Sequence, residues 1–175
     1  PFNDDLTIAT DLYVELARRL FDDGCAGLAP FGTTGEALSV GIDERIDAID
    51  ALINGGVDPA RMIPGTGLSN VADTARLSRA CLDRGCAAVM TLPLFYYKAV
   101  SDDALYRYFV QLAEAIGSDA RIFLYHIQPI AIVGVSLNRV NVAGLATLSL
   151  TESLYFPAWS EWAVTFGILS GATLF

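Results

Sequence analysis

Three short segments of this chain carry polar or aromatic residues directly after an apolar run. They are residues 31–36, 92–98 and 124–129, which contain a pair of threonines, a pair of tyrosines followed by a lysine, and a Tyr-His pair. The carboxyl ends of parallel strands meet at one end of a sheet, where such folds keep their chemistry. The sequence therefore predicts one shared site at that end.

The first segment reads Gly32-Thr33-Thr34-Gly35-Glu36. Two hydroxyl groups and two glycine N–H groups at the start of a helix could cradle a carboxylate. In the alternative interpretation, a threonine only caps the helix and Glu36 adds a favourable first-turn charge.

Phenols dominate the other two segments, with Tyr96 and Tyr97 in one and Tyr125 in the other. A phenol with a pKa near 10 is a poor base alone, but beside a threonine hydroxyl it can relay protons. Aromatic packing is the alternative for each tyrosine. Lys98, the only lysine, is expected to be a solvated loop charge, and His126 a core histidine.

Composition limits the classes of function. The 175 residues are 53% hydrophobic, and 20 acidic against 11 basic residues give a net charge of -9. This is the composition of one globular domain, and its charge disfavours binding to nucleic acid or to anionic membrane surfaces. No apolar run approaches the roughly 18 residues of a membrane span, and no leader-like segment opens the sequence.

The cysteines and the histidine argue against disulfides and metal. Cys25, Cys81 and Cys86 are odd in number and have no C-x-x-C spacing, so we expect reduced, buried side chains and a cytoplasmic protein. His126 is the only histidine, so no zinc site is expected.

Apolar runs and helical periodicity alternate along the chain. This alternation predicts repeated right-handed βα units around a parallel sheet, an α/β fold. Beyond residue 136 the rhythm is lost, and we expect a helix over 137–148, a strand over 154–156 and a helix over 162–169. The earlier predicted helices are 8–22, 42–53, 70–84 and 102–116, and the predicted strands are 25–31, 61–65, 87–93 and 121–125.

Several of these segments, taken in order, resemble the dihydrodipicolinate synthase/N-acetylneuraminate lyase family of class I aldolases. The resemblance covers about the first 140 residues and implies a TIM-type (β/α)8 barrel, incomplete in this chain because a full barrel takes about 250 residues. We therefore expect a single partial domain over 1–175, with family-like units in 1–140 and remnants of later units in 141–175. The resembling motifs are residues 1–5, 32–36, 44–45, 64–67, 93–97 and 124–125.

This resemblance also implies roles for individual residues. In the family, a lysine on the sixth strand forms a Schiff base with pyruvate or another 2-keto acid, and no cofactor is used. By resemblance Thr33 relays protons, Thr34 binds the carboxylate with Gly32 and Gly35, and Tyr125 transfers protons. Tyr97 resembles a tyrosine contributed by a neighbouring subunit, which implies a homo-oligomer.

Two departures from the family pattern bear on the chemistry. The lysine strand is missing, because the sequence passes from Val140 directly to Asn141, which resembles the start of the following helix. Ile130 stands where dihydrodipicolinate synthases usually have an arginine for the second substrate, which argues against aspartate semialdehyde.

Three hypotheses follow. The first is a lyase or synthase acting on pyruvate or a related 2-keto acid by Schiff-base aldol chemistry. The second is a catalytically inactive, lysine-less relative that binds a small carboxylate or serves as an oligomer subunit, since the imine has no nucleophile without an amine. The third, an α/β scaffold without a ligand, fits less well with the clustered threonines and tyrosines.

Overall fold

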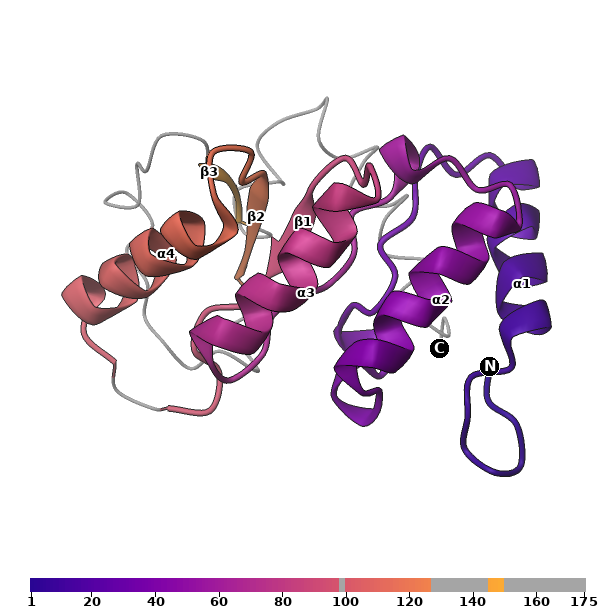
Figure 1. Ribbon diagram of the computed structural model, residues 1–175, viewed down its shortest axis with the longest axis horizontal. Helices are drawn as coiled ribbons and strands as arrows, with labels where there is room; N and C mark the ends of the chain where they lie inside the picture. The colour runs from indigo at the N-terminus through magenta and orange to yellow at the C-terminus, as the bar shows by residue number, and fades with distance from the viewer. Residues whose placement is uncertain (98–99, 127–144, 150–175) are drawn as a thin grey trace.

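The computed structural model describes residues 1–97, 100–126 and 145–149. Four α-helices lie where the periodicity predicts them and follow one another across the molecule in chain order (Figure 1). Each packs against the next along the chain. They are α1 (Thr10–Asp22), α2 (Ile42–Asn54), α3 (Val71–Asp83) and α4 (Asp102–Ile116).

Local side-chain contacts fix where α3 and α4 begin. The Asn70 side chain accepts a hydrogen bond from the Asp73 N–H (2.8 Å), and the Ser101 hydroxyl accepts one from the Ala104 N–H (3.2 Å). Both residues cap orphan N–H groups of a first turn. The start points of α3 and α4 are thus encoded by single residues.

A parallel sheet lies behind α3 and α4. Its strands are β1 (Val89–Thr91), β2 (Ile122–His126) and β3 (Leu145–Ser149), in the order β1-β2-β3 (Figure 1). Both pairings are parallel, with Val89 opposite Ile122 and Ile122 opposite Leu145. β1 and β2 are parallel strands joined through α4, which confirms a predicted βα unit.

The predicted strands over 25–31 and 61–65 extend this sheet through single parallel bridges. Leu28 pairs with Met62, and Gly65 pairs with Met90. Pro30 and Pro64 have no N–H to donate, so a continuous ladder cannot form across these runs. The strand order therefore follows the chain order from residue 28 to β3.

One prediction was wrong. Residues 145–148, expected at the end of a helix over 137–148, belong instead to β3. A short apolar run cannot be assigned to helix or strand by periodicity alone, and β2 offers an edge for parallel pairing. The rest of that predicted helix, and the elements expected over 154–156 and 162–169, lie outside the described residues.

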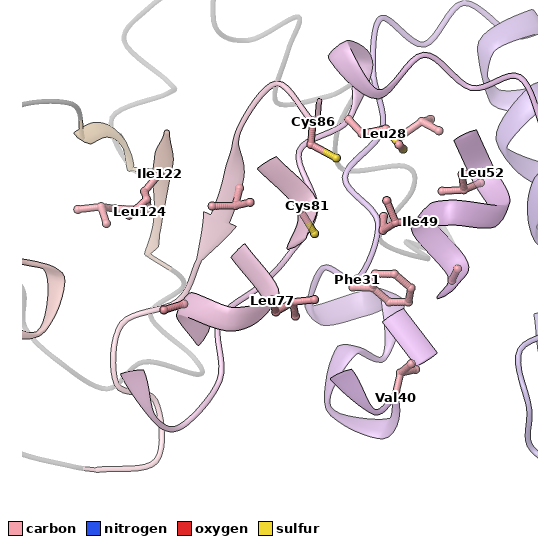
Figure 2. Close-up of a cluster of buried hydrophobic side chains, with 14 of the residues drawn as sticks. Leu28, Phe31, Val40, Ile49, Leu52, Leu77, Cys81, Cys86, Ile122 and Leu124 are labelled. Atoms are coloured by element: carbon pink, nitrogen blue, oxygen red, sulfur yellow. The ribbon is translucent and has the colours of Figure 1, made fainter. Parts of the chain in front are cut away.

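The hydrophobic core fills the space between helices and sheet. Figure 2 shows Ile49 and Leu52 of α2, Leu77 of α3 and Leu124 of β2 in one buried cluster. The three cysteines are free and buried within it, as their apolar surroundings predicted.

Candidate active site

The turn after the first predicted strand has an unusual backbone. Phe31 and Glu36 have φ values of 60° and 55°, a region that residues other than glycine rarely occupy. Between them lies the 3-10 helix η1 (Thr33–Gly35), and η2 (Ala37–Ser39) follows. Left-handed residues at both ends of η1 fold the segment sharply, which is common at functional sites.

The expectation that this segment opens an α-helix was wrong. The next α-helix, α2, begins only at Ile42, and no side chain caps η1. The Gly35 N–H donates to the Gly32 carbonyl oxygen (3.0 Å), so it closes the turn. A helix dipole therefore does not explain any affinity of the turn for a carboxylate.

Two glycines let neighbouring segments approach this turn. A methyl group at Gly65 would overlap the Phe31 carbonyl oxygen, and one at Gly67 would lie 2.6 Å from the Leu92 nitrogen. Any side chain at these positions would separate the backbones. The segment over 64–67 thus sets the distance between the end of β1 and the turn over residues 31–36, called the Phe31 turn below.

These segments enclose an open cavity of about 260 Å³. Both Thr33 and Tyr125 contribute to the wall of this cavity. The structure therefore brings together residues from two of the three segments that the sequence singled out, 31–36 and 124–129. This volume is smaller than the roughly 300–1,000 Å³ of sites for drug-sized molecules, and suits a ligand of a few heavy atoms. The lining residues are Phe31, Gly32, Thr33, Glu36, Ala37, Leu38, Ser39, Gly65, Gly67, Met90, Leu92 and Tyr125.

The Thr33 hydroxyl and the Tyr125 phenol are the polar groups of greatest chemical interest in this wall. Thr33 Oγ1 is buried and has no hydrogen-bond partner among the residues that the structure describes. Burial raises the pKa of Tyr125 above the usual phenol value, while the nearby Thr33 hydroxyl lowers it in part. The two residues line the same cavity without forming a hydrogen bond to each other. A buried hydroxyl without a partner is uncommon, and a ligand atom would satisfy it.

Other predicted site residues stand apart from this pair. Tyr97 does not line the cavity; it is 57% exposed and packs edge-on against Tyr96 at 5.5 Å between ring centroids. Thr34 lies in η1, but its side chain is outside the described part of the structure, as is that of His126. Lys98 and Ile130 also lie outside the described residues.

Arg45 is a residue whose importance the sequence interpretation missed, beyond quoting it in a motif. It lies on α2, only 1% exposed, and donates to the carbonyl oxygens of Ala37 and Val40. The signal was present, because Arg45 is three residues after Ile42 and four before Ile49, on the apolar face of the helix.

The described residues hold neither a metal-binding cluster nor a membrane-spanning helix. Across 1–97, 100–126 and 145–149, no group of three or more His, Cys, Asp or Glu residues is arranged to hold a metal ion. Within the same ranges, no helix has the length and apolar character needed to cross a membrane.

Comparison with known proteins identifies the family. The model of the dihydrodipicolinate synthetase family matches residues 1–151. The chain belongs to this family. The dihydrodipicolinate synthetase fold is a (β/α)8 barrel, and the helices and parallel strands described above form part of one.

Individual members of the dihydrodipicolinate synthetase family show how much of the barrel is covered. An uncharacterized DapA-like lyase of Chloroflexus aurantiacus is 38% identical over 128 residues, which are 73% of this chain and 42% of the relative. The dihydrodipicolinate synthase structure from Agrobacterium tumefaciens matches with a TM-score of 0.77 and 34% identity, over 90% of this chain and 52% of that one. YagE of E. coli K12, a member of the family solved in complex with pyruvate, matches with a TM-score of 0.68 and 26% identity, over 78% of this chain and 44% of YagE. The chain thus spans about half the length of the relatives it matches.

Proposed function

We propose that the protein containing this chain is a lyase or synthase that acts on pyruvate or a related 2-keto acid by Schiff-base aldol chemistry. The observation that carries the proposal is the buried, unpartnered Thr33 hydroxyl in a small cavity shared with the Tyr125 phenol. Membership of the family supports it, as does the pyruvate bound to the related YagE.

In this proposal the Phe31 turn binds the carboxylate end of the keto acid. Thr34 is the direct carboxylate ligand, and Gly32 and Gly35 shape the turn through their mutual hydrogen bond. The Tyr125 phenol, whose pKa burial raises, is protonated at neutral pH, and in this proposal it donates a proton that Thr33 relays. Tyr97 acts from a neighbouring subunit.

The covalent step needs an amine. Schiff-base formation joins a neutral amine to the keto carbon with loss of water, and β3, the strand beside that of Tyr125, reads Leu-Ala-Thr-Leu-Ser without a lysine. In the first proposal the amine belongs to a part of the protein that this sequence does not include. The composition of β3 favours a second candidate, a lysine-less relative that binds a small carboxylate or serves as an oligomer subunit.

Borohydride trapping separates the two candidates. The natural protein is incubated with pyruvate and borohydride, and the mass increase is located by peptide mapping. An adduct on a lysine outside this sequence supports the lyase. An unchanged mass together with measurable pyruvate binding supports the lysine-less binder, and an adduct on Lys98 would overturn both assignments by showing a relocated nucleophile.

Four further assignments belong to the proposal. We place residues 1–175 in a single partial barrel domain, with 141–175 as remnants of later units. The protein acts as a homo-oligomer and in the cytoplasm. Aspartate semialdehyde is disfavoured as a second substrate because Ile130 replaces the expected arginine.

A further inference from the structure

The guanidinium of Arg45 is buried without a carboxylate partner among the described residues. Its Nε donates to the Val40 carbonyl oxygen (3.1 Å), its Nη2 to the Ala37 carbonyl oxygen, and its Nη1 has no partner there. The guanidinium carbon also lies 5.9 Å from the centroid of the Phe31 ring. A buried charge compensated only by carbonyl groups and an aromatic ring is costly.

All of these contacts of the Arg45 guanidinium are with residues of one segment, 31–40. Phe31 opens the turn that carries Thr33, Ala37 begins η2, and Val40 follows η2. Phe31 and Ala37 also line the cavity, whereas Arg45 does not. Arg45 thus touches the wall of the cavity from behind, at both ends of the turn (Figure 2 shows Phe31 and Val40).

Geometry explains why arginine suits this position. Its planar fork can donate to two carbonyl oxygens at once while its face packs against an aromatic ring. Lysine offers a single ammonium on a flexible stem and cannot do the same. The guanidinium stays charged although burial lowers its pKa.

We infer that Arg45 is a positioning residue for the ligand cavity, whose guanidinium holds residues 31–40 so that the Thr33 hydroxyl faces Tyr125. The inference rests on the proposed function, because the ligand used to test it is a 2-keto acid. It assigns no contact between Arg45 and the ligand.

Chemical rescue provides the first test. In the full chain, Arg45→Ala should weaken pyruvate binding at least 10-fold in calorimetry, and tens of millimolar methylguanidinium should restore it to within about 3-fold. Methylammonium carries the same charge without the planar set of N–H donors, so it should not restore pyruvate binding. Unchanged affinity in Arg45→Ala, or failure of methylguanidinium to rescue it, would overturn the inference. If Arg45→Ala does not fold, Arg45→Gln, whose amide keeps one donor nitrogen, takes its place: pyruvate binding should again weaken, but without rescue, because the glutamine side chain fills the space.

Arg61 offers a control with the same kinds of contact, although its side chain is exposed whereas that of Arg45 is buried. It too donates to two carbonyl oxygens, of Cys25 and Ala26 (2.8 Å each), and its guanidinium carbon lies 3.9 Å from the Phe21 ring centroid. These contacts lie at the opposite end of the same apolar run. Arg61→Ala should leave pyruvate affinity within about 2-fold, and an equal loss in both variants would reduce the role of Arg45 to general stability.

Amide hydrogen exchange tests the positioning role of Arg45 without any ligand. Arg45→Ala should speed amide exchange over residues 31–40 at least 10-fold while α4 keeps its protection. Equal acceleration in α4 would contradict a positioning role. If the wild-type chain fails to bind pyruvate, the proposed function is wrong, but this exchange pattern still tests whether Arg45 positions the turn.

Discussion

Thr33 and Tyr125 come from segments about ninety residues apart in the chain and meet at one cavity. Burial raises the pKa of Tyr125, and the nearby Thr33 hydroxyl lowers it in part. We predict that Thr33→Val, which is nearly isosteric and lacks the hydroxyl, raises the pKa of Tyr125 further. Thr33→Ser should leave it close to the wild-type value.

This prediction is checked by NMR titration of ring-labelled tyrosine. A pKa of Tyr125 that is the same in Thr33→Val and wild type would show that the two groups do not interact.

Three tyrosines, one buried and two partly buried, also predict how stability depends on pH. Burial raises the pKa of Tyr13, Tyr108 and Tyr125, so the folded chain keeps these phenolic protons to higher pH than the unfolded chain. The contribution to stability is fully present below the unfolded pKa of about 10 and is lost as the pH rises toward the folded values.

We therefore expect the free energy of unfolding, measured by urea denaturation, to fall above about pH 10. The fall should be shallower in Tyr125→Phe than in Tyr106→Phe, which changes an exposed tyrosine of α4. Equal slopes for the two variants would contradict the role given to Tyr125.

At the scale of elements, the site depends on the close approach of three segments at the ends of the strands. Because a side chain at Gly65 would overlap the Phe31 carbonyl, Gly65→Ala should cost about 2–4 kcal/mol of unfolding free energy. Gly41→Ala meets open space at an ordinary φ of -65° and should cost less than about 1 kcal/mol. Similar losses in the two variants would mean that the turn can move away from Gly65.

Sequence periodicity predicted the helices well because their apolar faces repeat and polar residues such as Asn70 and Ser101 mark their starts. It failed at β3, where a short apolar run carries no decisive period and only pairing with β2 decides. The sequence could suggest that Thr33 and Tyr125 lie at the same end of the sheet, because each is close to the end of a predicted strand. It could not reveal the carbonyl contacts of Arg45 or the left-handed backbone at Phe31, because both depend on packing between segments.

At the scale of the whole molecule, the loop after β1 exposes aromatic surface. Tyr96 is 73% exposed and packs only edge-on against Tyr97 among the aromatic pairs of the described residues. Exposed aromatic groups of this kind mark interaction surfaces. We predict a homo-oligomer in sedimentation experiments, and dissociation toward monomer at micromolar concentration in a Tyr96→Ser/Tyr97→Ser double variant. A wild-type chain that sediments as a monomer at all concentrations would contradict this.

The most direct test of the proposed site is calorimetric titration of the chain with pyruvate, comparing wild type with Thr33→Val. We expect saturable binding to the wild type and affinity about 10-fold weaker or more in the variant, since a hydrogen bond to a charged ligand contributes about 1.5–3 kcal/mol. Thr10→Val, at an exposed position at the start of α1, should bind like the wild type. No binding to the wild type, or equal affinity for wild type and Thr33→Val, would contradict a 2-keto acid site built around Thr33 and Tyr125.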